Sequence, residues 1–352
     1  MRPIVGRITK FSRVNKNNPC PVCGKDHWCR FAVLEDINGK EIPIAICNRV
    51  QSDIEFWDNG GGFIHFINDI PLSVKLQSVK EKRNNNIAPL ERRNLIYQKF
   101  LSYFTISDTT MQSFIRNRGF TKELVKYLGY KDYDRRKIFQ IAQELYERYG
   151  DLTGIPGAYL KEGKNGFKYW MFGGMDKSIL LPSRALNEKD IFKQGPIQAI
   201  NYRIPGVEKN KYRYLSSANK PNGTSSGAPV HVSVPMVIKK KNIIGITEGI
   251  IKADYWANKV GMIVLAVMGV STWKTAISVV KEIQNKIDLE GVIVAFDADK
   301  KTNQYVRLYE QRLIEGLKEI GVKTAVAYWD LIYGKGIDDL LKNGYIPKYK
   351  IV

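Results

Sequence analysis

Three acidic side chains stand just after short apolar segments in the C-terminal part of the chain. Glu248 follows the segment 243–246, and Asp297 and Asp299 follow the segment 292–296. Both segments are rich in β-branched residues and precede helical patterns, which is typical of parallel strands whose carboxyl ends carry an active site. Carboxylates gathered at one sheet edge repel each other unless a cation lies among them, and hard oxygen ligands suit Mg²⁺. These residues predict metal-dependent phosphoryl chemistry.

The elements that must position these acids form an alternating β-α pattern from residue 242 onward. It predicts strands at 243–247, 262–268, 292–296 and 323–328, and helices at about 250–259, 272–286 and 304–320. Right-handed crossovers build such a pattern into a parallel sheet covered on both faces, an α/β fold. Asp338 lies just past the last strand, at the same carboxyl edge, and is a fourth candidate acid.

The chain carries a large excess of positive charge. Its 352 residues predict two or three domains, and 55 Lys and Arg against 35 Asp and Glu give a net charge of +20. This excess predicts a polyanionic partner, because each neutralised phosphate releases condensed counterions. No segment approaches the roughly 20 apolar residues of a membrane span, and residues 1–13 lack the apolar core of a signal peptide. We expect a cytoplasmic nucleic-acid-binding protein without a membrane partner.

The cysteines are confined to one short region and have the spacing C-x2-C-x5-C-x17-C. They are Cys20, Cys23, Cys29 and Cys47. In a reducing compartment such clustering argues for a metal site rather than disulfides. Four thiolates suit a tetrahedral structural Zn²⁺, so we expect a zinc ribbon. His27 in place of Cys29 is the alternative fourth ligand.

A hairpin explains how ligands so far apart in the sequence can meet. The pair Asn38-Gly39 is the strongest short hairpin signal, and it separates two runs with strand character. A turn centred on that pair sets residue 30 opposite residue 47. Cys29 and Cys47 then meet at the open end of the hairpin.

Composition changes along the chain predict its domain organisation. Residues 80–86 all have charged or amide side chains, which is a linker composition. Residues 95–149 have helical periodicity, and residues 155–237 have the pattern of short strands with glycine and proline turns. The expected parts are a zinc-ribbon domain at 1–72, a basic linker at 73–94, a helical subdomain at 95–150, a mixed α+β basic subdomain at 151–240 and an α/β domain at 241–352.

The acids and glycines of the last part resemble the TOPRIM fold. The matching features are Thr247-Glu248-Gly249 after the first strand, Val267-Met268-Gly269 after the second, the pair Asp297 and Asp299 after the third, and a closing lysine-to-aspartate segment at 335–339. TOPRIM domains occur in primases, topoisomerases and some nucleases. The resemblance therefore implies one of these activities.

The context of these motifs resembles bacterial DnaG-type primases. The stretch 211–217 (KYRYLSS) is similar to a basic, tyrosine-leucine, small-polar stretch of that family's RNA-polymerase core, and 179–184 and 198–203 are similar to the strands before it. The resemblance implies a C-terminal TOPRIM domain preceded by a mixed α+β RNA-polymerase-like domain and an N-terminal zinc ribbon.

Two positions depart from the pattern of cellular primases. Lys252 stands four residues after Glu248, where those enzymes usually have an aspartate, and Gly336 stands where they often carry an acid. Cellular primases also commonly bind zinc with three Cys and one His. The variant segment 247–254 is more similar to TOPRIM primases of phages, plasmids and other mobile elements. No Walker-type helicase motif follows, so a separate helicase or replication protein is expected as a partner.

The resemblance implies synthesis of short primers on a single-stranded DNA template from nucleoside triphosphates. Asp297 and Asp299 would hold one or two Mg²⁺ or Mn²⁺ ions, Asp338 would complete the set, and Glu248 would join the metal site or orient the attacking 3′-hydroxyl. Lys252 would pair with an acid of the site or meet a phosphate. The candidate contacts to template and triphosphate are Arg184, Arg203, Lys211, Arg213 and Lys252.

Two other functions use the same residues. A TOPRIM nuclease or topoisomerase-like enzyme would use the same acids with water or a tyrosine as nucleophile. A non-catalytic replication factor would bind single-stranded DNA through the ribbon and the basic surface. For a primase we expect the ribbon, with Trp28 and Arg30 beside its ligands, to read the template initiation site.

Overall fold

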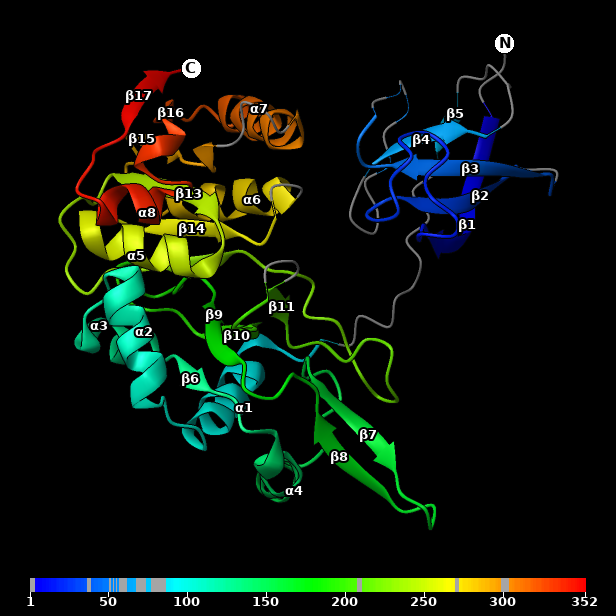
Figure 1. Ribbon diagram of the computed structural model, residues 1–352, viewed down its shortest axis with the longest axis horizontal. Coiled ribbons are helices and arrows are strands. Elements are labelled where there is room, and N and C mark those ends of the chain that lie inside the picture. Colours follow the sequence, from blue (N-terminus) through cyan, green and yellow to red (C-terminus); the bar gives the residue numbers. More distant parts are fainter. Residues whose placement is uncertain are drawn as a thin grey trace. The chain divides into compact units, whose positions relative to one another are not determined.

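The chain forms two compact units, Met1–Arg83 and Asn84–Val352, in the computed structural model (Figure 1). The structure describes residues 4–36, 39–50, 52, 54, 56, 62–67, 74–76, 87–207, 211–269, 272–298 and 304–352. Among the helices in these ranges, none has the length and apolar character needed to cross a bilayer. The architecture mixes helices with four β-sheets.

The first unit is built on a five-stranded sheet in the order β4-β3-β2-β1-β5. Its strands are β1 (Ile4–Arg13), β2 (Arg30–Asp36), β3 (Glu41–Cys47), β4 (Phe63–Phe66) and β5 (Val74–Leu76). On β2 the buried residues Ala32 and Leu34 alternate with more exposed ones, and they form the centre of the core with Ile44 and Ile46 of β3. This alternation is what a half-buried antiparallel sheet requires.

The predicted hairpin is present, but its register differs by one residue. Arg30 pairs with Ile46 rather than with Cys47, and the N–H of Asp36 donates to the carbonyl of Lys40 at 3.0 Å. Gly39 has φ +79°, a left-handed conformation that glycine favours in hairpin turns. The expected pairing of residue 30 with residue 47 was wrong by one residue, and Asn38 lies outside the described residues.

The second unit begins with helices α1 (Leu90–Ser102), α2 (Asp108–Arg118), α3 (Lys122–Leu128) and α4 (Ile138–Tyr149). Short polar residues and glycines set their limits. The side chain of Ser107 accepts the N–H of Thr110 at the start of α2, and Gly119 ends the helix at φ +71°. Thr121 and Gly129 bound α3 in the same way. These caps satisfy backbone groups that the helix ends leave unpaired.

A four-stranded sheet in the order β11-β10-β9-β6 follows these helices, together with a two-stranded hairpin. Its strands are β6 (Lys131–Asp132), β9 (Ile179–Arg184), β10 (Ile197–Arg203) and β11 (Tyr212–Tyr214), and the hairpin pairs β7 (Ala158–Glu162) with β8 (Lys168–Phe172). Helix α1 is fastened to β10 where the side-chain oxygen of Asn94 accepts the N–H of Ile197 at 2.8 Å.

A six-stranded sheet in the order β12-β14-β13-β15-β16-β17 forms the C-terminal part. The strands are β12 (His231–Ser233), β13 (Ile243–Glu248), β14 (Val264–Val267), β15 (Gly291–Val294), β16 (Thr324–Tyr328) and β17 (Lys348–Ile351). The four central strands are parallel, which confirms the prediction, and the two outer strands are antiparallel. The outer strands were not predicted because β12 has three residues and β17 is exposed along its whole length.

Helices cover both faces of this sheet (Figure 1). They are α5 (Ile250–Val260), α6 (Trp273–Gln284), α7 (Gln304–Glu319) and α8 (Ile337–Lys342), with a 3₁₀ turn at Leu331–Tyr333 before α8 and another at Arg135–Lys137 before α4. One core contains α5 and α8 together with α2 and α3, and the other contains α6 and α7. The helical region thus shares a core with one face of the sheet.

Candidate active site

Sheet register brings the acids to one edge. Strands β13 and β15 are parallel neighbours with Ile246 opposite Val294, so their carboxyl ends, and with them Glu248 and Asp297, lie side by side. At the end of β13, Gly249 takes φ +89°, a conformation that favours glycine, and starts α5. Asp338 stands in the first turn of α8. Asp299 lies outside the described residues.

Lys252 lies among these acids. Its ammonium pairs with Oδ1 of Asp297, and Nζ of Lys335 lies 4.0 Å from Oδ2 of the same carboxylate. Burial alone lowers the pKa of Lys252, but the combined charges of Asp297, Glu248 and Asp338 raise it above the ordinary lysine value. The lysine is therefore a fixed positive charge at the point where the acids converge.

Asp338 is the most buried of the described acids at this edge of the sheet, with 4% of its surface exposed. Its Oδ2 accepts a hydrogen bond from Nη1 of Arg118 at 3.2 Å, whereas Oδ1 is buried with no hydrogen-bond partner among the described residues. Burial and the neighbouring Asp339 raise the pKa of Asp338. A buried carboxylate oxygen without a donor is costly, and it is a position where a cation or a proton is stabilised.

Gly336 makes room for this arrangement. A Cβ at that position would meet the carboxylate of Asp338 and would lie 3.0 Å from Cε of Lys252. The absence of a side chain at Gly336 thus leaves space that Lys252 borders. A longer side chain at 336 would displace either the lysine or the aspartate.

The donor chemistry of this edge fits a divalent cation, but its described carboxylates are not gathered into a closed site. In the ranges that the structure covers, the sole set of three or more His, Cys, Asp or Glu ligand atoms within 4.8 Å of one another is the cysteine cluster. The ammonium of Lys252 pairs with Asp297 instead, and the charges of Glu248 and Asp338 also raise its pKa. A metal at Asp297 would share that carboxylate with Lys252, which pairs with its Oδ1, while Oδ1 of Asp338 has no hydrogen-bond partner among the described residues.

Cations gather next to the acids. Lys211 stands just before β11, and its pKa is lowered by burial and by the charges of nearby basic residues. These residues are Arg118, Arg203, Lys252 and Lys335. Nε of Arg203 is buried and has no hydrogen-bond partner among the residues described. Mutual repulsion within such a cluster is relieved by a bound anion, so it has the character of a phosphate site.

Two of these cations, Arg118 and Lys335, were not among the sequence-based candidates. Arg118 belongs to a run of charges on α2 that, from the sequence, has the character of a solvated helix surface. Lys335 belongs to the segment 335–339 that closes the motif set. The glycines on either side of it, Gly334 and Gly336, are the sequence feature that could have marked it as a candidate. Only contacts between distant segments distinguish both from the other basic residues.

Arg184 and Arg213 lie in other surroundings. Nη1 of Arg184 donates to the carbonyl of Gly195 at 3.1 Å, and its backbone N–H donates to Nδ1 of His231 at 2.9 Å. Burial lowers the pKa of Arg184, partly offset by the charge of Asp254. Arg213 is exposed on β11, opposite Tyr202. No contact in the described structure joins Arg184 to Asp297 or Asp338.

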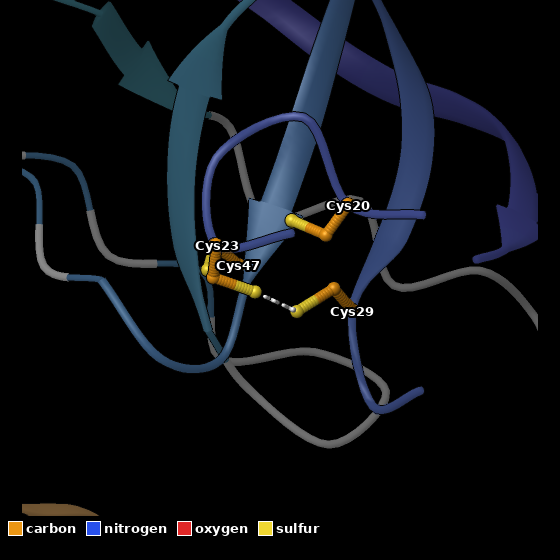
Figure 2. Close-up of side chains that lie close together, drawn as sticks. All are labelled: Cys20, Cys23, Cys29 and Cys47. Atoms are coloured by element: carbon orange, nitrogen blue, oxygen red, sulfur yellow. Dashed lines mark hydrogen bonds between the residues drawn. The ribbon is translucent and has the colours of Figure 1, made fainter. Parts of the chain in front are cut away.

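The four cysteines come together in the first unit (Figure 2). Their sulfur atoms all lie within 4.8 Å of one another, with Sγ of Cys29 3.8 Å from that of Cys47 and 3.6 Å from that of Cys23. The hydrogen bond between the sulfur atoms of Cys29 and Cys47 lowers the pKa of Cys29 to about 5 and raises that of Cys47. Four sulfur donors at this spacing fit a structural Zn²⁺ site.

The backbone next to this cluster supports the same interpretation. The N–H groups of Arg49 and Val50 each donate to Sγ of Cys47 at 3.3 Å, which stabilises a thiolate. His27, the alternative ligand, is outside the cluster and forms a hydrogen bond with Asp26 at 2.6 Å. Trp28, which stands between His27 and Cys29 in the sequence, is 67% exposed and has φ +71°, a backbone conformation that is uncommon for a bulky residue.

Comparisons with known proteins give limited matches. A family model described as "Domain of unknown function (DUF3854)" matches residues 235–345, less than half of the chain. No curated protein matches the sequence.

Solved structures of primases share part of the arrangement. The DnaG primase catalytic domain bound to single-stranded DNA is 15% identical, covers 73% of this chain and 78% of its own, and has a TM-score of 0.47. The zinc-binding and RNA polymerase domains of the Aquifex aeolicus primase are 13% identical, with a TM-score of 0.49. That match covers 78% of this chain and 64% of the Aquifex chain. The primase fragment of the bacteriophage T7 primase-helicase is 14% identical, with a TM-score of 0.36. That match covers 69% of this chain and 76% of the T7 fragment.

Proposed function

We propose that this protein is a DNA primase that synthesises short oligonucleotides on single-stranded DNA, with a TOPRIM domain at its C-terminal end. The observation that carries the proposal is the placement of Lys252, Asp297 and Asp338 at the carboxyl edge of a parallel sheet, directly beside a cluster of cations. A polymerising enzyme needs this combination, because acids position the reacting groups and cations hold two polyanions, the template and the triphosphate.

The acids have distinct roles in this proposal. Asp297 and Asp338, together with Asp299, are the carboxylates for Mg²⁺ or Mn²⁺, and Glu248 joins them or orients the attacking 3′-hydroxyl. When bound, the metal ions neutralise charge on the attacking and leaving oxygens of an in-line phosphoryl transfer. The chain itself contributes positioning, since two-metal nucleotidyl transfer needs no covalent intermediate on the protein.

Lys252 links the metal site to the phosphate site. Its ammonium neutralises Asp297 in the described structure, a role that a divalent cation held by Asp297 would share. Lys252 would then be available to a triphosphate oxygen, together with Lys211 and Lys335. The remaining contacts to triphosphate and template come from Arg118, Arg203, Lys211, Arg213 and Arg184.

The first unit has a recognition role in the proposal. A Zn²⁺ ion held by the four cysteines stabilises the loop that presents Trp28, and the neighbouring guanidinium of Arg30 lies 5.7 Å from the ring centre of Phe56. An exposed tryptophan next to basic side chains suits a single-stranded template, because bases stack on aromatic rings irrespective of sequence. The segment 247–254 supports an origin in a phage or mobile element, with the helicase supplied by another chain.

Incubation of the full chain with single-stranded template, Mg²⁺ and labelled nucleotides tests the proposal. New short oligomers support primer synthesis. A shortened template indicates a nuclease, and binding without any product indicates a replication factor; either result overturns the proposal. The variant Asp297→Asn should reduce synthesis by roughly 10²-fold or more, since it removes a charge from the reacting centre. Asp288→Asn, at an exposed position before β15, is the matched control and should retain full activity.

A further inference from the structure

The hairpin β7–β8 carries an exposed aromatic surface that the candidate active site does not use. Figure 1 shows its two strands extending away from the six-stranded sheet, at the other end of the second unit. Phe167, in the tip of the hairpin, is 70% exposed, and Phe139, on the adjoining helix α4, is 51% exposed. Exposed phenylalanines in a group are unusual on a protein surface unless something binds there.

The aromatic rings form a continuous row. The ring of Phe167 stacks on Tyr169, with centroids 6.5 Å apart and planes inclined by 18°. Tyr169 in turn meets Phe139 edge to face, with centroids 5.3 Å apart and planes at 80°. Three rings in line, with the two outer ones open to solvent, offer flat surfaces to further aromatic groups.

The row is held in place by the backbone and by the core beneath it. The N–H of Gly163 donates to the carbonyl of Phe167 at 2.9 Å, which closes the hairpin loop. On the inner side, Trp170 and Phe172 of β8 are buried in the core, and Nε2 of Gln143 on α4 donates to the carbonyl of Trp170 at 3.0 Å. The aromatic tip is thus preorganised, so little conformational entropy is lost when a ligand binds.

The charges around the row are mostly positive. The hairpin, residues 158–172, contains three lysines and one glutamate. Lys161 lies directly across from Tyr169 in the strand register, and the exposed Lys164 and Lys168 stand three residues before and one residue after Phe167. An alternation of aromatic rings and cations at this spacing suits a strand that presents bases and phosphates in turn.

We propose that the β7–β8 hairpin is a second binding site for single-stranded nucleic acid, in which unpaired bases stack on Phe167 and Phe139 while Lys161, Lys164 and Lys168 meet the phosphates. The identification of the strand as the DNA template rests on the proposed function. A protein partner fits less well, because lysines next to open aromatic faces complement a polyanion with π-faces.

Fluorescence anisotropy with the full chain and a labelled oligo-dT of about 20 nucleotides tests this inference. Phe167→Ala and Phe167→Leu should each weaken binding by about 5- to 150-fold, the effect of losing one stacked base, whereas Phe167→Trp should retain the affinity. Tyr349→Ala, which removes a 49% exposed aromatic side chain from β17, is the matched control and should leave the affinity unchanged. Equal thermal midpoints for the variants and the unmodified chain show that folding is intact.

A second oligomer separates stacking from phosphate binding. With an abasic strand of the same length, Phe167→Ala and the unmodified chain should bind equally, because only the base contact has been removed. A variant with alanine at Lys161, Lys164 and Lys168 should bind both strands less tightly, with a salt slope about 2 units shallower. Unchanged oligo-dT affinity for Phe167→Ala, including the case in which the hairpin binds a protein, overturns the inference, as does an equal loss with the abasic strand.

These measurements are independent of primer synthesis. A chain that binds oligo-dT through Phe167 but makes no primers retains this inference and loses the proposed activity. A chain that makes primers but binds oligo-dT equally well with Phe167→Ala retains the activity and loses the hairpin site.

Discussion

The guanidinium of Arg118, at the end of α2, lies 3.2 Å from the carboxylate of Asp338, at the start of α8, although 220 residues separate them in the sequence. The aspartate is almost wholly buried and the arginine is mostly so. This pair joins the helical region to the edge of the sheet where the acids converge.

Replacing Arg118 by alanine should lower the free energy of unfolding by about 1–3 kcal/mol, because it leaves the buried Asp338 carboxylate without its hydrogen-bond donor. Urea unfolding of the full chain measures the change. Arg116→Ala is the control, since Arg116 lies exposed on the same helix and its loss should alter the free energy by no more than about 0.5 kcal/mol. Equal effects of the two substitutions would contradict a specific role for the pair.

Asp338→Asn should stabilise the fold at neutral pH while reducing primer synthesis. The pKa of Asp338 is raised in the folded state, so the folded carboxylate is harder to ionise than the unfolded one. Its ionisation therefore costs stability above the folded pKa, and the cost disappears as the pH falls below the ordinary aspartate value. Unfolding without added metal, followed against pH, should show the variant more stable at pH 7 and the difference vanishing in acid. A variant less stable at pH 7 would contradict this expectation.

Asp254→Ala should destabilise the second unit by about 3–5 kcal/mol, because a buried carboxylate with several donors is lost. Oδ1 of Asp254 accepts from Nε2 of His231 at 3.0 Å and from the Ser233 hydroxyl at 2.5 Å, and Oδ2 accepts from the Tyr130 hydroxyl at 2.5 Å. These contacts connect α5 with β12 and with the loop that leads into β6. Calorimetry would measure the loss, and a thermal midpoint within about 1 °C of the unmodified chain would refute it. Asp288→Ala, at an exposed position, serves as the control.

Zinc analysis of the purified chain should find one ion per molecule, and Cys47→Ser should remove it, because the Cys47 sulfur is within reach of all three other ligands. Loss of the ion should make the first unit sensitive to proteases while Asn84–Val352 remains intact, since the two units are separately compact. His27→Ala is the control and should retain the zinc, because His27 is paired with Asp26 outside the cluster. A zinc-free His27→Ala protein would reassign the ligands.

Sequence patterns located the regular elements of the last part of the chain well, because each depends on neighbours close in the sequence. The apolar run 243–246 and the helical pattern after it correspond to β13 and α5. In contrast, β17 has no buried side chain, and nothing in its four residues distinguishes it from a coil. The predicted pairing of β2 with β3 was one residue out of register, because a turn glycine is compatible with hairpin loops of two or three residues.

The sequence by itself determined which residue types are present to do chemistry: the acids that end parallel strands, the four cysteines and the excess of lysine and arginine. Alternation and spacing carry that information locally. Only the tertiary structure decided that Lys252 lies against Asp297, that Arg118 rather than Arg116 reaches Asp338, and that Phe139 continues the aromatic row of the hairpin. Each of these depends on how separate helices and strands pack together, and a basic or aromatic side chain has the same local pattern whether it lies in solvent or beside a distant partner.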